Sequence, residues 1–165
     1  MPIMKILSKN PEETIRLGKK LGKMIVAGAM HQTVHGGQVL ALYGDLGGGK
    51  TQFTKGIALG LGISDNIVSP TFTIRREYSG KKLNLLHYDF YRFEKPDQEL
   101  VENLDEGISP ENVTVIEWAE RVEKYFPKDT IKINFKYISE GVREIEIEDN
   151  NLEAILSAVI PTDYT

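Results

Sequence analysis

The sequence has no cysteine among its 165 residues and only one tryptophan. Without thiols the chain forms no disulfide, carries no cysteine nucleophile and builds no cysteine-based zinc site, an absence that fits a reducing compartment. Basic residues are not in excess either, because 20 lysines and arginines stand against 24 aspartates and glutamates, a formal net charge of −4. This balance argues against broad nucleic-acid binding by the protein alone, although action on RNA through a partner stays open.

Long hydrophobic runs are also missing. No apolar stretch approaches the roughly 20 residues of a membrane-spanning helix, and the first residues lack the apolar core of a signal peptide. We therefore expect a soluble, cytoplasmic protein with no membrane partner. The length is that of one domain, so we expect residues 1–160 to form a single domain and residues 161–165 to be a flexible tail.

A glycine-rich loop at residues 44–51 is the strongest motif of the chain. It reads G-D-L-G-G-G-K-T and matches the phosphate-binding pattern G-x-x-x-x-G-K-[ST]. Glycines let the backbone N–H groups point inward at an anion, the lysine reaches the β- and γ-phosphates, and the threonine hydroxyl ligates Mg²⁺. The pattern therefore assigns nucleotide binding to Gly44, Asp45, Leu46, Gly47, Gly48, Gly49, Lys50 and Thr51, with Thr51 also a metal ligand.

The flanking residues give this loop the context that the motif requires. Residues 38–43 are a short apolar run typical of a buried strand, and Phe53, Ile57 and Leu61 follow at helical spacing. The simple alternative is a glycine-rich turn that ends in Lys-Thr by chance. A strand before the loop and a helix after it favour a nucleotide site instead.

Two acidic residues end predicted strands elsewhere in the chain. Residues 113–117 form a short apolar strand that ends in Glu117, the pattern of a Walker B element whose acid holds the Mg²⁺ water shell or orients a water molecule. Asp89 lies near the end of a strand predicted at residues 83–92, where it meets Mg²⁺, water or a substrate group, or is simply solvated. Trp118 either lines the nucleotide pocket or belongs to the core.

The remaining elements surround this centre. Asn10 and Pro11 predict the start of a helix that runs to about residue 27, with Thr14 in its first turn. Residues 72–78 and 83–92 predict one antiparallel hairpin, and residues 130–138 and 142–147 predict a second, in which Arg143 either faces the site or is solvated. Short helices are expected at residues 96–104, after Trp118 and at residues 152–159. Ser69, Thr71 and Thr73 are candidates for sensing the γ-phosphate, with a plain loop as the alternative.

These blocks, in this order, resemble the TsaE (YjeE) ATPases of bacterial tRNA threonylcarbamoyladenosine biosynthesis. The resemblance covers residues 10 to about 121, and two of its blocks are specific: H-Y-D-F-Y-R at residues 87–92 and E-W-A-E-R at residues 117–121. Two departures are small. Gly48 stands where the family often has alanine, and Ala119 stands where it often has proline.

The resemblance implies a fold, an activity and partners. The fold is a three-layer P-loop NTPase-like α/β fold, with a mixed sheet that has a parallel core and antiparallel hairpin additions. The activity is slow, Mg²⁺-dependent ATP hydrolysis that supports TsaD and TsaB in forming N6-threonylcarbamoyladenosine at position 37 of tRNAs, so tRNA is reached only through the complex. By resemblance, Lys50 and the loop amides hold the phosphates, and Thr51 and Glu117 hold Mg²⁺. Asp89 and Trp118 support hydrolysis or partner coupling, and Thr14 lies near the base.

Other functions of a phosphate-binding loop remain as alternatives. A small-molecule kinase needs an acceptor pocket and usually a lid of arginines, for which Arg75, Arg76 and Arg92 are available, although no insertion of lid length is evident. A nucleotide-dependent assembly factor would bind ATP without hydrolysing it. A GTPase is disfavoured because the chain has no Asn-Lys-x-Asp element to read guanine.

Overall fold

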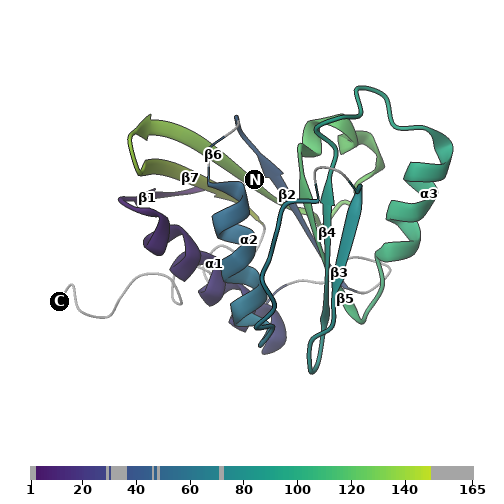
Figure 1. The fold of residues 1–165 in the computed structure, drawn as a ribbon, viewed down its shortest axis with the longest axis horizontal. Helices are drawn as coiled ribbons and strands as arrows, with labels where there is room; N and C mark the ends of the chain where they lie inside the picture. Colours follow the sequence, from purple (N-terminus) through teal and green to yellow (C-terminus); the bar gives the residue numbers. More distant parts are fainter. Residues whose placement is uncertain are drawn as a thin grey trace.

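The computed structural model describes residues 3–28, 30, 37–45, 47, 49–70 and 73–149 (Figure 1). Within them, seven strands form one sheet in the order β1-β7-β6-β2-β5-β4-β3. Helices α1 (Pro11–Val26) and α2 (Lys50–Gly60) pack on one face, and α3 (Gln98–Gly107) lies on the other. The predicted three-layer α/β fold is confirmed. The predictions for Leu46, Gly48, Thr71 and residues 152–165 lie outside the described residues.

The centre of the sheet is parallel. Strand β2 (Gln38–Tyr43) pairs in parallel with β5 (Asn112–Glu117) and with β6 (Ile131–Ser139), and β4 (Asn84–Asp89) pairs in parallel with β5. Nearly every residue of β2, β4 and β5 is buried, as expected for strands covered on both faces. The ends of these three strands are therefore firmly placed relative to one another.

Antiparallel strands extend the sheet on both sides. Strand β3 (Arg75–Tyr78) pairs with β4, β7 (Val142–Glu148) pairs with β6, and β1 (Ile3–Ser8) pairs with β7 at the far edge. Both predicted hairpins are confirmed. The β6–β7 hairpin lies between β2 and β1, so β1 joins the sheet through β7.

Helices α1 and α2 touch through their backbones. A Cβ atom added to Gly56 of α2 would lie 2.1 Å from the carbonyl oxygen of Ile15, and one added to Gly18 of α1 would lie 2.3 Å from that of Phe53. Real Cβ atoms do not approach this closely, so only glycine permits the observed spacing. The close approach ties α1 to the helix that follows the phosphate loop.

The start of α1 is capped as its sequence predicts. Asn10 Oδ1 accepts a hydrogen bond from Glu13 N at 2.8 Å, and Pro11 occupies the first turn. Glu13 does not reach back to the cap residue itself. Its Oε2 accepts from Lys9 N at 2.7 Å, one residue earlier. Among the described residues, none of the helices combines the length and apolar character needed to cross a membrane.

Candidate active site

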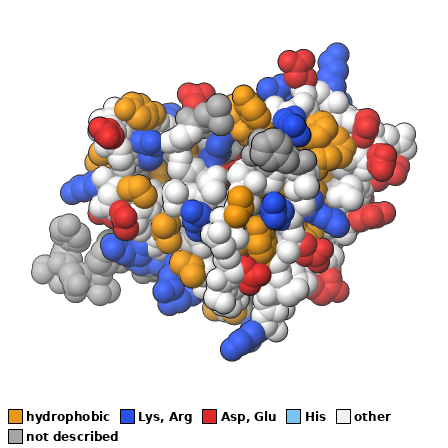
Figure 2. Space-filling model, in the orientation of Figure 1, with side chains coloured by type: hydrophobic (Ala, Val, Ile, Leu, Met, Phe, Trp, Pro, Cys, Tyr) orange, Lys and Arg blue, Asp and Glu red, His pale blue; other side chains and the backbone are white. Residues whose placement is uncertain are grey.

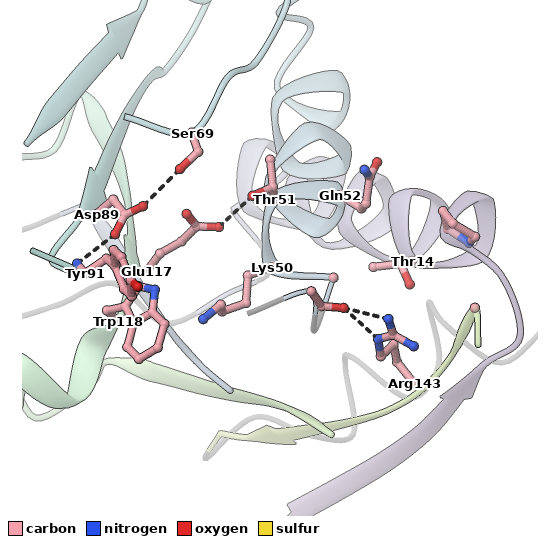
Figure 3. A pocket seen from close by; sticks show the side chains of 14 residues that line it. Thr14, Lys50, Thr51, Gln52, Ser69, Asp89, Tyr91, Glu117, Trp118 and Arg143 are labelled. Carbon is pink, nitrogen blue, oxygen red and sulfur yellow. Dashed lines mark hydrogen bonds between the residues drawn. The ribbon is translucent and has the colours of Figure 1, made fainter. Parts of the chain in front are cut away.

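A cavity of about 380 Å³ opens where β2, β4 and β5 end (Figure 3). Its walls come from the phosphate loop and the start of α2, from the ends of β4 and β5, from the start of α1, and from the β6–β7 hairpin. The predicted residues that line it are Thr14, Gly47, Gly49, Lys50, Thr51, Asp89, Glu117 and Trp118. Gly44 and Asp45 do not line it, although the Gly44 carbonyl contacts Lys50.

The loop takes a shape that needs glycine. Gly44 has φ 130° and Gly49 has φ 97°, backbone conformations that other residues rarely adopt. A Cβ atom on Gly44 would also lie 2.4 Å from the carbonyl oxygen of Phe135. Helix α2 begins directly after Gly49 without a side-chain cap. The N–H groups of its first turn therefore stay available to an anion at the cavity.

Lys50 is a cation buried in this cavity, with 6% of its surface exposed. Its Nζ donates to the Gly44 carbonyl oxygen and lies 4.3 Å from the centre of the Trp118 ring. Burial lowers the pKa of the Lys50 ammonium, and the neighbouring carboxylates, Glu117 first, oppose that shift. A desolvated ammonium held by one carbonyl and one ring is well placed to bind an anionic ligand.

Thr51 and Glu117 place two side-chain oxygens side by side. Thr51 Oγ1 donates to Glu117 Oε1 at 3.2 Å, as Figure 3 shows. The parallel register sets Glu117 beside Leu42, two residues before the loop begins. Mg²⁺ prefers oxygen ligands and usually binds through one or two protein groups, phosphates and water. Two neighbouring side-chain oxygens are therefore the kind of donor set that suits a Mg²⁺ ion brought in by a nucleotide. Among the described residues, no three acidic or histidine side chains gather in a way that could hold a metal ion.

Asp89 has a buried carboxylate whose two oxygens accept hydrogen bonds, which rules out the simple alternative of a solvated residue at a strand end. It is 7% exposed. Its Oδ2 accepts from Ser69 Oγ at 2.9 Å and its Oδ1 accepts from Tyr91 N at 2.8 Å. The register sets Asp89 directly beside Glu117 on the neighbouring strand. Ser69 thus lines the cavity and contacts an acid, whereas Thr73 does not line it.

Trp118 lines the cavity and also packs against the second hydrophobic core. Its backbone has φ 55° and ψ 46°, the left-handed conformation, which a residue other than glycine rarely takes. Its ring lies 5.0 Å from the Tyr91 ring. The residues after it form 3-10 turns, Ala119–Arg121 and Glu123–Tyr125, so the predicted helix here is two short turns.

The opposite wall is built by α1 and by the β6–β7 hairpin. Thr14 is buried, and its Oγ1 lies 2.7 Å from Ser8 Oγ, a hydrogen bond between α1 and the end of β1. Arg143 of β7 faces the site. Its Nε and Nη2 donate to the Gly47 carbonyl oxygen at 3.0 and 2.6 Å, which ties the hairpin to the phosphate loop.

Sequence reasoning missed several side chains at or near this site. Pro11, Gln52, Tyr91 and Gly141 line the cavity without having been assigned to it. His87 lies beneath the cavity, with its Nε2 3.4 Å from Glu117 Oε2. The signal for His87 was present in the sequence, because a residue two positions before Asp89 shares its face of the strand. Of the three arginines considered for a kinase lid, none lines the cavity, and Arg75 lies within 3.5 Å of the Tyr88 hydroxyl.

Comparison with known proteins gives consistent matches. The model of a family described as "Threonylcarbamoyl adenosine biosynthesis protein TsaE" matches residues 8–145. The chain is 42% identical over 145 residues to the tRNA threonylcarbamoyladenosine biosynthesis protein TsaE of Bacillus subtilis (strain 168), covering 88% of this chain and 85% of that protein. It is 37% identical over 144 residues to the protein of that name from Treponema pallidum (strain Nichols), covering 87% and 99%.

A solved structure also has the same fold. The crystal structure of Bacillus subtilis YdiB superposes with a TM-score of 0.73 at 33% sequence identity, covering 96% of this chain and 94% of that one. The similarity therefore extends over nearly the whole chain, rather than over the phosphate loop alone.

Proposed function

The chain belongs to the TsaE family, and from this premise we propose that it is a Mg²⁺-dependent ATPase of tRNA modification. In this proposal residues 1–160 act as one ATPase domain in the cytoplasm, and its ATP hydrolysis supports TsaD and TsaB in forming N6-threonylcarbamoyladenosine at position 37 of tRNAs. The protein itself does not transfer the threonylcarbamoyl group.

The observation that carries this proposal is the meeting of Lys50, Thr51 and Glu117 in one cavity. Lys50 is a buried cation, and Thr51 and Glu117 present adjacent oxygens at the start of α2. ATP supplies the phosphoanhydride bond that is hydrolysed, and the positive charge of Mg²⁺ draws electrons away from that bond. Lys50 and the loop amides bind and orient the phosphates, while Thr51 and Glu117 hold the metal ion.

Asp89 is the residue that we assign to hydrolysis or to partner coupling. Its two oxygens are fixed by Ser69 and by the Tyr91 backbone, so its carboxylate keeps one orientation toward the cavity. A carboxylate held in this way can accept a hydrogen bond from an attacking water molecule. Because Ser69 belongs to the loop after α2, a partner that moves this loop would also remove the hydrogen bond that orients Asp89 Oδ2.

Charge supports an indirect route to tRNA. The net charge is −4, and Figure 2 shows acidic side chains over α3, where the exposed residues are Glu99, Glu102, Asp105 and Glu106. Such a surface repels the phosphate backbone of RNA. Partners that bind the tRNA themselves resolve this difficulty, which is why we place TsaD and TsaB between this protein and the tRNA.

The experiment that tests the proposal measures ATP hydrolysis with Mg²⁺, with and without purified TsaD–TsaB. We expect strong stimulation by the partners and its loss in Glu117→Ala. The matched control is Glu106→Ala, which removes an exposed carboxylate of α3 and should leave the rate unchanged. Nucleotide-dependent binding to the partners without hydrolysis in any mixture would instead identify an assembly factor, and a phosphorylated metabolite would identify a kinase.

A further inference from the structure

His87 is a buried histidine that the proposed function leaves without a role. It lies on β4 two residues before Asp89, so both side chains project from the same face of the strand. The register places His87 beside Val115 of β5 and Asp89 beside Glu117. The imidazole therefore lies one step deeper in the sheet than the two carboxylates at the cavity, and it has no exposed surface.

The imidazole is an unsatisfied polar group. Neither Nδ1 nor Nε2 has a hydrogen-bond partner among the described residues, and both atoms are buried. Every protonation state of imidazole carries at least one N–H, and burying a donor without an acceptor costs about 1–3 kcal/mol. An acceptor is within reach, because Glu117 Oε2 lies 3.4 Å from Nε2. An approach of about 0.4 Å, together with a rotation that aims the N–H at this oxygen, would give an ordinary hydrogen bond.

The two oxygens of Glu117 have different neighbours. Oε1 accepts from Thr51 Oγ1 at 3.2 Å, on the side of the cavity (Figure 3). Oε2 faces His87 on the side of the sheet. The carboxylate, which is almost fully buried, therefore lies between the hydroxyl of α2 and the imidazole of β4.

We propose that His87 is a positioning residue for Glu117. Its Nε2–H donates to Oε2, which keeps Oε1 beside Thr51 Oγ1, where the two oxygens would hold Mg²⁺. The inference rests on the proposed function, in which Thr51 and Glu117 hold the metal ion. Residues that support a metal ligand in this way typically change metal affinity or activity about 10- to 100-fold when lost. A histidine that only filled space would be replaced without loss by an apolar side chain of similar size.

The contact itself can be tested in the nucleotide-free protein. The chain has three histidines, His31, His35 and His87, so the signals of ¹⁵N-labelled imidazoles can be assigned with a His87→Gln variant. We expect the proton of His87 to be on Nε2, to exchange slowly with water, and to shift in Glu117→Gln. The proposal would be overturned by a proton on Nδ1 with no proton on Nε2, or by His87 signals that do not change in Glu117→Gln.

If His87 positions Glu117, removing the imidazole should reduce the effect of Mg²⁺ on the affinity for ATP. Calorimetry measures the affinity for ATP with and without Mg²⁺ in the natural chain, His87→Leu and His87→Gln. The gain from Mg²⁺ is the factor by which Mg²⁺ raises the affinity for ATP. We expect His87→Leu to bind ATP without Mg²⁺ as tightly as the natural chain does, and its gain from Mg²⁺ to be about tenfold smaller. His87→Gln should recover most of that gain, because its amide N–H can reach the position of Nε2.

The matched control is Thr114→Val, which removes another buried and unpartnered polar atom from the opposite face of β5. It should leave the gain from Mg²⁺ unchanged. If His87→Leu folds and keeps the gain within about twofold of the natural chain, the positioning role is overturned.

Failure of the proposed function would look different. A natural chain that binds ATP no more tightly with Mg²⁺ would contradict the proposed metal site, while the imidazole signals would still decide whether His87 donates to Glu117. Those signals are recorded on the natural chain and on Glu117→Gln. They decide the contact even if His87→Leu does not fold.

Discussion

The two walls of the cavity come from different parts of the sheet and differ in chemistry. One wall is formed by Lys50, Thr51, Asp89 and Glu117, at the ends of parallel strands and at the start of α2. Its charged groups are buried, and each contacts a hydroxyl group or the backbone. We call it the parallel wall. The wall formed by Thr14, Gly141 and Arg143 comes from α1 and the antiparallel hairpin, and we call it the hairpin wall.

The difference between the two walls separates groups suited to the reaction from contacts that shape the cavity. The two carboxylates of the parallel wall are held by strands buried on both faces, and Lys50 is held at the start of α2, which suits groups that must keep one geometry during a reaction. The hairpin wall has a hydroxyl paired with Ser8 and a guanidinium bound to a loop carbonyl. These contacts hold the phosphate loop and shape the cavity. We therefore expect changes in the parallel wall to have larger functional effects than changes in the hairpin wall.

The largest effect is expected for Lys50→Ala in the parallel wall. Hydrogen bonds to charged groups contribute about 1.5–3 kcal/mol each, so losing the ammonium should weaken ATP binding by about 100-fold or more. Calorimetric titration with ATP measures this change. Lys55→Ala is the matched control, because Lys55 belongs to the same helix and does not line the cavity. An unchanged affinity in Lys50→Ala would refute the phosphate site.

The next effect is expected where α1 and α2 join the two walls. In Gly56→Ala the new Cβ would meet the Ile15 carbonyl, so the helices must separate, and we expect the free energy of unfolding to fall by about 2–3 kcal/mol. Denaturant unfolding measures it. Gly62→Ala is the control: its Cβ meets nothing within 4 Å, and its φ of +76° should cost about 1 kcal/mol. Equal losses in both variants would contradict the close helix contact.

A smaller effect is expected for Arg143→Gln in the hairpin wall. The Gly47 carbonyl loses two donors, but the side chain is only half-buried, so we expect the affinity for ATP to fall about fivefold, or about 1 kcal/mol. The same calorimetric titration applies, with Arg76→Gln of β3 as a control outside the cavity. A loss as large as that of Lys50→Ala would show that the two walls share the binding of the phosphates.

The smallest effect is expected outside the cavity, on the antiparallel edge. Hydrogen bonds from Lys136 and Lys5 lower the pKa of Glu146 to about 2 from 4.5. A lowered pKa in the folded protein means that this contribution is present above about pH 4.5 and is lost as the pH falls toward 2. Because the two lysines are exposed, we expect Glu146→Gln to remove less than about 1 kcal/mol of this acid dependence, measured by urea unfolding at several pH values. An identical pH dependence in both chains would contradict it.

Much of the parallel wall could be predicted from sequence because each of its residues ends a recognisable local pattern. The loop motif gives Lys50 and Thr51, and two apolar strands give Asp89 and Glu117. The helix cap at Asn10 and both hairpins are likewise local, and all are confirmed. Patterns of this kind depend on neighbours in the chain, so one sequence is enough to find them.

Features that depend on distant segments could not be predicted in the same way. The contact of Arg143 with Gly47 requires the β6–β7 hairpin to pair with β2, which no local pattern states. The helix contact through Gly18 and Gly56 depends on two glycines that each look like weak points of a helix. The positive φ of Trp118 follows from its position between Glu117 and a 3-10 turn, where the surrounding packing overrides local preference.

The most direct test of the nucleotide site uses Trp118, the only tryptophan of the chain, as a reporter. Lys50 lies over its ring, so phosphates that draw the ammonium away should change the fluorescence during a titration with ATP and Mg²⁺. We expect a saturable change with the midpoint found by calorimetry, and no such change at the same ATP concentrations in Lys50→Ala. A flat fluorescence titration, with equal calorimetric affinity in the natural chain and in Lys50→Ala, would place ATP outside this cavity and contradict the account.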